Sequence, residues 1–117
     1  MSHLTTIDVK VMNQTLLRRL AMKYGWTITK VPKFVNNYSG EEVENATILS
    51  DGTQVKLVLS EDGTPVVDSY FMGKEWERFL QEYSIENLRE QACLEGYTFK
   101  GVEQKSDGSL IVEIETA

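Results

Sequence analysis

Residues 17–31 and 88–102 carry related sequences, and this internal echo constrains the fold more than any other feature of the chain. The first segment reads LRRLAMKYGWTITKV and the second reads LREQACLEGYTFKGV. At a constant offset of 71 residues, the matching pairs are Leu17/Leu88, Arg18/Arg89, Ala21/Ala92, Gly25/Gly96, Thr27/Thr98 and Val31/Val102, with Trp26/Tyr97 as an aromatic pair. Each segment is followed, further along, by an Asp-Gly turn and an alternating run, at 51–59 and at 107–115. The pattern predicts a helix–strand–strand unit that is used twice.

Helical periodicity occurs in three places. The apolar spacing over 14–24 predicts an amphipathic helix, with Asn13 as its N-cap and Gly25 as its left-handed stop. Residues 76–83 place aromatic and leucine side chains at helical spacing. Ser84 is then predicted to cap a separate helix over about 85–95, which ends at Gly96.

Alternating and β-branched runs predict the strands. They cover residues 5–11, 26–31, 46–49, 54–59, 65–71, 97–103 and 110–115, with Asp-Gly hairpin turns between several of them. Residues 32–45 combine Pro, Asn, Ser and Gly with three glutamates, and they are predicted to form an exposed loop inserted into the first copy of the repeat.

These elements predict one α+β domain over residues 1–117, built from an antiparallel sheet with two to three helices on one face. A ferredoxin-like arrangement with internal pseudo-duplication is the first candidate topology. The test is whether equivalent strands follow the two related helices.

Composition and charge limit the classes of protein to which the chain can belong. Hydrophobic residues make up 41% of the chain, which is enough for a core, and no apolar run is long enough to span a bilayer. The first residues lack the pattern of a secretory signal, and a lone cysteine suits a reducing compartment, so a cytoplasmic protein is expected. The net charge of −6 makes nucleic acid an improbable partner. It is unevenly spread, because residues 1–40 hold six Lys and Arg against one Asp, whereas residues 41–117 hold six against seventeen Asp and Glu.

No catalytic constellation is visible in the sequence. His3 is the only histidine, and Cys93 lies beside Ala92 in a predicted helix, where a buried and inert thiol is expected. Phosphate-binding loops, nucleophile elbows and paired cysteines are missing from the sequence. The chain is therefore expected not to be an enzyme and to need no cofactor or metal.

Aromatic side chains are the main candidates for a binding surface. Trp26 and Tyr97 occupy equivalent places after a helix stop, and core packing is the simpler interpretation of both. Trp76 belongs to an aromatic cluster that would bind a partner if it were exposed. Phe34 and Tyr38 lie in the predicted loop, where they could form an aromatic contact site.

Several segments carry a family resemblance: Met-Ser-His-Leu-Thr-Thr-Ile at the start, residues 8–25, Gly-Lys-Glu-Trp-Glu at 73–77, residues 88–96, and Asp-Gly-Ser-Leu-Ile-Val-Glu-Ile at 107–114. They resemble a small family of unknown function from cyanobacteria, other bacteria and chloroplast genomes, named in algae hypothetical chloroplast open reading frame thirty-five. The resemblance implies a cytosolic or stromal protein with no established catalytic residue, and it singles out His3. It also implies an accessory role beside an AAA-type ATPase.

The leading hypothesis is a non-enzymatic binding or adaptor protein that acts through a protein partner. The candidate partner-binding residues are His3, Trp26, Phe34, Tyr38, Trp76 and Tyr97. Two alternatives stay open: a small-molecule-sensing domain with Trp26 and Tyr97 in equivalent clefts, in which a homodimer would form the pockets, and an acidic mimic of nucleic acid of phage origin.

Overall fold

The computed structural model describes residues 5–6, 9–37, 39–68, 72–104 and 110–116, and the side chains of 9–37, 39–68 and 72–96. The chain divides into two compact units, Met1–Tyr83 and Ser84–Ala117. Each unit is described by itself below, and helix α2 (Glu75–Leu94) contributes residues to both. The single domain expected for residues 1–117 stays a prediction.

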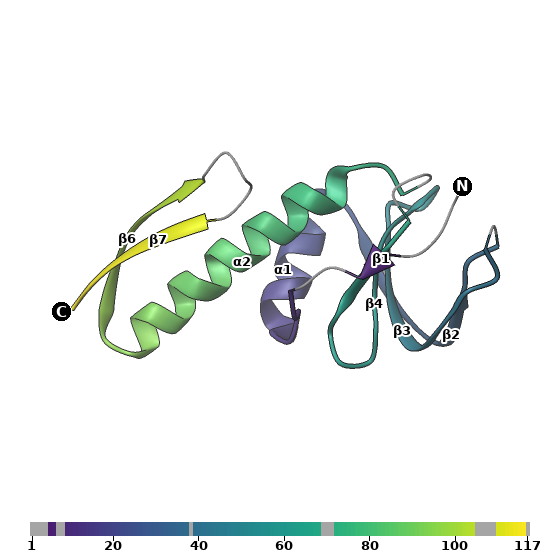
Figure 1. Cartoon of the computed structure of the whole chain (residues 1–117), viewed down its shortest axis with the longest axis horizontal. Helices are drawn as coiled ribbons and strands as arrows, with labels where there is room; N and C mark the ends of the chain where they lie inside the picture. Colours follow the sequence, from purple (N-terminus) through teal and green to yellow (C-terminus); the bar gives the residue numbers. More distant parts are fainter. Residues whose placement is uncertain (1–4, 7–8, 38, 69–71, 105–109, 117) are drawn as a thin grey trace. The chain divides into compact units, whose positions relative to one another are not determined.

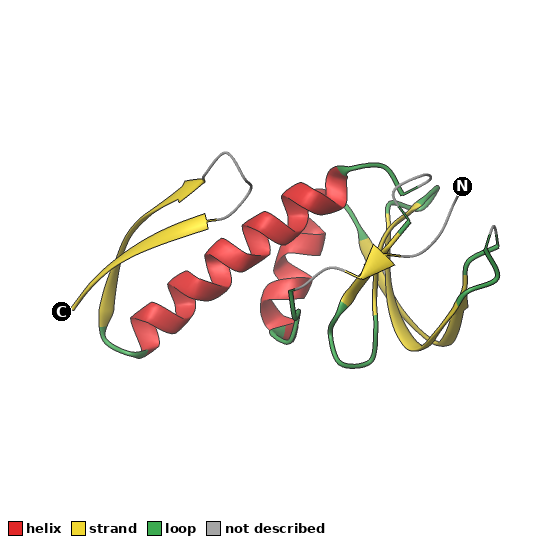
Figure 2. Ribbon diagram, in the orientation of Figure 1, coloured by secondary structure: helices red, strands yellow, loops and turns green. Residues whose placement is uncertain are grey.

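The first unit is built on a five-stranded antiparallel sheet (Figure 1). Its strands are β1 (Thr5–Thr6), β2 (Thr27–Val35), β3 (Glu42–Ser50), β4 (Val55–Leu59) and β5 (Pro65–Val67), in the order β1-β5-β4-β3-β2. Helix α1 (Gln14–Tyr24) connects β1 to β2, at opposite edges of the sheet (Figure 2). The α+β class with an antiparallel sheet is confirmed. The ferredoxin-like arrangement is not confirmed, because β2 to β5 follow one another as a simple meander.

Helix α1 forms as its sequence predicts. The Asn13 side chain accepts a hydrogen bond from the Leu16 backbone nitrogen at 3.1 Å, which satisfies one free donor of the first turn. Gly25 ends the helix with a φ of 74°. The apolar stripe is buried and consists of Leu16, Leu17, Leu20 and Ala21.

The first strand is shorter than predicted. Residues 9–11 follow β1 outside any strand, although Val11 is buried in the core and Val9 packs against it. The backbone nitrogen of Val11 donates to the carbonyl oxygen of Gly63 at 2.8 Å, so this segment is held by a turn of the sheet.

The predicted loop over residues 32–45 is largely a β-hairpin. Strand β2 continues through Pro32 to Val35, and β3 begins at Glu42, which leaves only residues 36–41 between them. Proline has no N–H to donate, but β2 is an edge strand, where proline is tolerated. Pro32 falls opposite Asn45, between the paired residues Val31 with Ala46 and Lys33 with Glu44, and Asn45 takes a positive φ of 47°.

This hairpin curls back over the sheet (Figure 1). Asp68 directly follows β5, and the strand register places it across the sheet from the first residues of β2. Asn36 directly follows the last residue of β2, at the opposite end of that strand. At about 3.3 Å per residue, a flat sheet would separate these two levels by about 25 Å. Instead, the Asn36 side-chain amide donates to the Asp68 carboxylate at 2.8 Å, and both residues are about 1% exposed. The curl thus closes on a buried polar contact.

Helix α2 is one continuous helix of 20 residues, not the two that the sequence predicts. Ser84 lies inside it rather than at a cap. A serine at an N-cap has a non-helical backbone. Residues 75–94 contain neither glycine nor proline, so nothing interrupts the helix at Ser84. Buried Phe79, Leu80 and Tyr83 hold its first part in the core of the first unit.

The second unit comprises the end of α2 and a hairpin of β6 (Tyr97–Gln104) with β7 (Leu110–Thr116). Gly96 takes a φ of 82°, and its nitrogen donates to the Cys93 carbonyl oxygen at 3.2 Å. The matching bond in the first unit joins Gly25 to Met22 at 3.1 Å. A helix, a left-handed glycine and an antiparallel strand pair therefore occur twice.

The equivalence predicted for the two Asp-Gly turns is wrong. Asp51 and Gly52 connect β3 to β4, so the strand that follows them is not the partner of β2. Asp107 and Gly108 instead fall between β6 and β7, which pair directly with each other, and their own structure lies outside the described residues.

Candidate functional site

The residues singled out from the sequence fall in different environments. His3 and Tyr38 lie outside the described residues. Tyr97 begins β6, and its side chain is also outside them. For these three residues a role in partner binding stays a prediction.

Trp26 lies in an aromatic cluster of the core. Its side chain is 5% exposed, and its ring stacks on Phe79 with centroids 4.9 Å apart at 25°. The Tyr24 ring completes the cluster, 5.0 Å from Trp26 and 5.3 Å from Phe79. The space around Trp26 is therefore occupied by side chains of the same unit.

Phe34 and Trp76 are half-buried and pack against the same core. The Trp76 indole nitrogen donates to the Gly73 carbonyl oxygen at 3.0 Å, so the polar edge of the ring is satisfied locally. Within the described part of the chain, Trp26, Phe34 and Trp76 therefore do not form one exposed aromatic patch.

The prediction of a buried thiol at Cys93 is wrong, because Cys93 is exposed. Ala92, its neighbour in α2, takes the buried position instead. In a helix the buried face changes from one residue to the next, so one adjacent apolar residue does not decide the burial of a cysteine.

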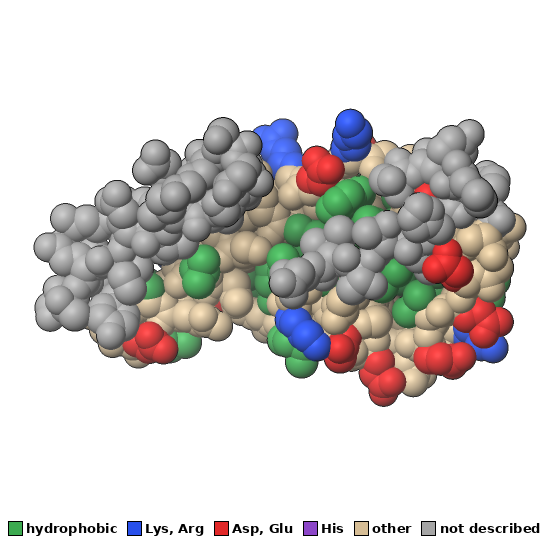
Figure 3. All heavy atoms as spheres, in the orientation of Figure 1, with side chains coloured by type: hydrophobic (Ala, Val, Ile, Leu, Met, Phe, Trp, Pro, Cys, Tyr) green, Lys and Arg blue, Asp and Glu red, His purple; other side chains and the backbone are tan. Residues whose placement is uncertain are grey.

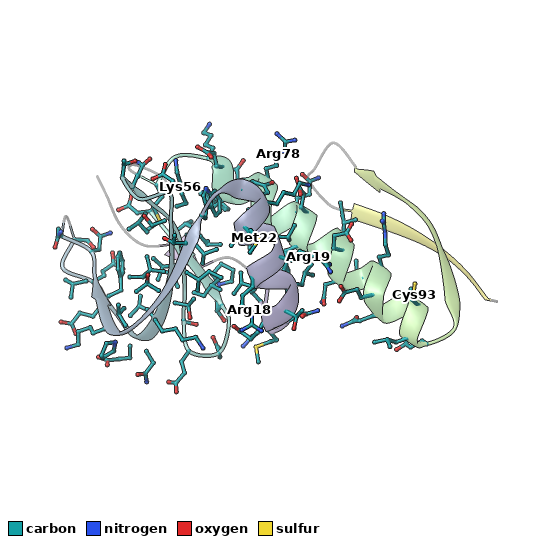
Figure 4. The ribbon with its side chains drawn as sticks, turned by 180° about the vertical axis from the view of Figure 1, so that it is seen from behind. Arg18, Arg19, Met22, Lys56, Arg78 and Cys93 are labelled. Carbon is teal, nitrogen blue, oxygen red and sulfur yellow. The ribbon has the colours of Figure 1, made fainter. Side chains whose placement is uncertain are left out.

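The outer face of α1 is a basic surface with an exposed methionine (Figure 4). We define the basic face as Arg18, Arg19, Met22 and Lys23 of α1 together with Arg78 of α2. Figure 4 labels all of these residues except Lys23. Met22 is 82% exposed, and helix α1 contains no acidic residue. Residues four apart lie on one side of a helix, so Arg18 is the neighbour of Met22, and Arg19 is the neighbour of Lys23.

One carboxylate organises the edge of the basic face. Glu82 accepts from the Lys23 ammonium at 2.9 Å and from the Tyr24 hydroxyl at 2.8 Å, and the Arg78 guanidinium lies 3.7 Å away. The hydrogen bond from Lys23 lowers the pKa of Glu82. Burial and the bond to Glu82 raise the pKa of Tyr24 to about 12. Lys23 and Arg78 are thus held in place, and their cationic groups stay exposed.

A cleft of about 260 Å³ lies at the other end of α1. Its lining comes from the segment before and at the start of α1, from β2, β3 and the end of β4, and from the following turn; the residues are Val11, Met12, Gln14, Lys30, Asn45, Thr47, Leu59, Ser60, Glu61 and Gly63. Because four separate stretches of the chain contribute, periodicity within any one of them could not reveal this cleft.

Strand pairing fixes one wall of the cleft. Lys30 pairs with Thr47, and Thr47 pairs with Leu59, so these side chains form a row across three strands on one face of the sheet. Beyond the row, the Asn45 side-chain amide donates to the Glu61 carboxylate at 3.2 Å. Within the described residues, no carboxylate pairs with Lys30, so the cleft holds a cation and an anion that are not bonded to each other.

Carboxylates elsewhere on the first unit are interleaved with cations (Figure 3). Lys56 lies 2.9 Å from Glu75 and 3.6 Å from Asp51, Lys10 lies 2.7 Å from Asp62, and Lys33 lies 3.3 Å from Glu42. Among the described residues, no group of His, Cys, Asp and Glu is arranged to hold a metal ion. The helices of the described part include none that is long and apolar enough to cross a membrane.

Comparison with family models, with curated proteins and with solved structures gave no match. The family resemblance noted in the sequence therefore stays a prediction.

Proposed function

We propose that the protein is a non-enzymatic binding protein that docks an acidic, partly apolar segment of a partner protein on the basic face of α1. The observation that carries the proposal is Met22, an apolar side chain at 82% exposure among four cations. Arginine and methionine are enriched in protein interfaces. A partner that covers the Met22 side chain would remove apolar surface from water, which stabilises the complex.

The charges define the partner's chemistry. A matching segment would place carboxylates against Arg18 and Arg19 and an aliphatic or aromatic side chain against Met22. Electrostatic complementarity of this kind raises the rate of association and falls with ionic strength. If the family resemblance holds, an AAA-type ATPase is the first purified partner to test, and the bacterial cytoplasm or the plastid stroma is the place to look for it.

The test compares three variants with the unmodified protein in binding experiments at low and physiological salt. The double variant Arg18→Glu/Arg19→Glu reverses the charge of the basic face, and Met22→Ser removes its apolar centre. The control is Lys33→Glu, which reverses another exposed cation, on β2, whose ammonium lies 3.3 Å from Glu42. Capture from cells of the source organism identifies the partner, and titration with that purified partner then measures affinity.

We expect the double variant to weaken binding by at least tenfold and the control to leave it unchanged. Acidic residues of the partner changed to lysine should restore binding to the double variant. Equal affinity for all four proteins would overturn the proposal, as would turnover of a small molecule by the pure protein alone. Association of the protein with itself through the basic face would instead identify a second copy as the occupant, which size-exclusion chromatography detects.

The two other hypotheses are less well supported. A small-molecule site at Trp26 would need space that Tyr24 and Phe79 occupy. A nucleic-acid mimic would need a continuous acidic strip, whereas the described ion pairs place Lys10, Lys33 and Lys56 among the carboxylates.

A further inference from the structure

We infer that the cleft at the start of α1 binds a small zwitterion, an α-amino acid with an aliphatic or thioether side chain. This site is separate from the basic face, so the inference does not depend on the proposed function. It rests on the size of the cleft, on its two opposite charges and on its apolar floor.

The charges match the two ends of an amino acid. Lys30 lies on β2, and two strand spacings of about 4.8 Å each separate its backbone from that of Leu59. Glu61 lies two residues beyond Leu59, in the turn after β4. The Lys30 ammonium would bind a carboxylate, and the Glu61 carboxylate would bind an ammonium. Each contact would be a charge-assisted hydrogen bond, the stronger class of hydrogen bond in proteins.

Glu61 is oriented for this role by its own neighbour. Asn45 donates to one carboxylate oxygen of Glu61 at 3.2 Å, and Asn45 itself is fixed by its left-handed backbone at the bend of β3. The other oxygen of Glu61 is left for a ligand. Thr47 and Ser60 add hydroxyl groups at the rim.

The floor of the cleft is apolar. Val11 and Leu59 are buried, and Met12 is 64% exposed beside them. The Met12 sulfur lies close to Gly63, where an added Cβ would approach it to 2.9 Å. A flexible thioether at this place can adapt to an aliphatic side chain. A volume of about 260 Å³ is at the small end of ligand sites and suits a single amino acid rather than a nucleotide or a peptide.

The experiment is a titration of the isotope-labelled full chain with L-leucine and L-methionine up to millimolar concentration, followed by backbone amide NMR. The deaminated and the decarboxylated analogues of leucine serve as probes that each lack one charge. We expect both amino acids to shift the amides of Lys30, Thr47 and Glu61, and each analogue to bind at least tenfold more weakly.

Two variants test the charges without disturbing the walls. Lys30→Met keeps an unbranched side chain only one atom shorter, and Glu61→Gln keeps an oxygen that can accept from Asn45. Each should weaken leucine binding about tenfold or more, the loss expected for one charge-assisted hydrogen bond. The matched controls are Lys33→Met on β2 and Glu44→Gln on β3, which remove an exposed ion pair outside the cleft.

Three results would overturn the inference. The first is the lack of any shift at these amides with either amino acid. The second is equal affinity for leucine in the cleft variants and the controls. The third is binding of a singly charged analogue as tight as that of leucine, which would show that the cleft does not recognise the charge that this analogue lacks.

Discussion

The hydroxyl oxygen of Tyr83 lies 2.9 Å from the backbone nitrogen of Asn13 and accepts its hydrogen bond. The same oxygen accepts from the backbone nitrogen of Met12 at 3.1 Å. Tyr83 is buried in the core, so this residue of α2 holds the backbone of residues 12–13 just before α1. The Asn13 side chain in turn caps the first turn of α1.

Changing Tyr83 to Phe should therefore destabilise the protein by about 1–3 kcal/mol, because two backbone donors lose their acceptor while the ring still fills the core. Urea denaturation followed by circular dichroism measures the loss. Tyr24→Phe is the matched control. The Tyr24 hydroxyl donates to the partly exposed Glu82, and in this variant Glu82 still accepts a hydrogen bond from Lys23. Equal losses in the two variants would contradict this account of Tyr83.

Alanine substitutions at Gly63 and Gly52 distinguish the cost of backbone strain from the cost of a steric clash. Both have a positive φ, 85° and 97°. A Cβ at Gly63 would lie 2.6 Å from the Val11 carbonyl oxygen, whereas one at Gly52 would meet nothing within 4 Å. Gly52→Ala should cost about 1 kcal/mol from strain alone. Gly63→Ala should cost about 1–3 kcal/mol more, since the backbone of residue 11 must move.

Thermal denaturation of the two alanine variants checks this difference. Similar melting temperatures would show that the Val11 segment moves aside at no cost, and that the bond from Val11 to Gly63 contributes little to holding it.

The buried contact between Asn36 and Asp68 should control the tip of the β2–β3 hairpin. Asn36→Ala leaves a carboxylate that is about 1% exposed without this amide, and we expect a loss of about 2–3 kcal/mol. Hydrogen exchange at residues 33–36 and 41–44 should accelerate more than exchange in β4. The exposed neighbour provides the control, because Asn37→Ala should change neither quantity. Uniform acceleration throughout the sheet would mean that the contact does not act locally.

Tyr24 should ionise later than an ordinary tyrosine. Its pKa is raised from 10.0 to about 12 by burial and by the bond to Glu82. Since the folded value lies above the unfolded one, the associated stability is present below pH 10 and is lost as the pH rises from 10 through 12. A pH titration followed by near-ultraviolet absorbance should show one tyrosine that ionises at unusually high pH, and Tyr24→Phe should remove that titration. Glu82→Gln should shift that phenol back toward 10, and an unchanged late titration in this variant would exclude Glu82 as a cause.

The local elements of the fold were predictable because their signals are local. Asn13, the apolar stripe of α1 and Gly25 determine where one helix begins and ends, and the Asp-Gly turn after β3 was evident from two residues. Asp51 also accepts from the Thr53 and Gln54 nitrogens, which lowers its pKa to about 2.

The errors arose where tertiary contacts decide. Pro32 has the local signature of a strand end, yet its place on an edge strand opposite Asn45 lets β2 continue. Ser84 has the signature of a cap, yet the helix that begins at Glu75 continues through it to Leu94. The basic residues of α1 could be identified from the sequence, but Arg78 and Glu82, which complete that face, come from residues about 60 further along the chain. The cleft is lined by four separate stretches of the chain and had no signal in the sequence.

The contact between Asn36 and Asp68 also sets an order of events during synthesis. The β2–β3 hairpin is complete once Ser50 has been added, but the residue that closes its tip lies 32 positions beyond Asn36. A hairpin that emerges from the ribosome must therefore wait with its tip open, and with Val43 uncovered, until β4 and β5 have followed. A pause in translation between residues 50 and 68 would prolong that exposure, so slow codons in this interval should favour aggregation of the nascent chain.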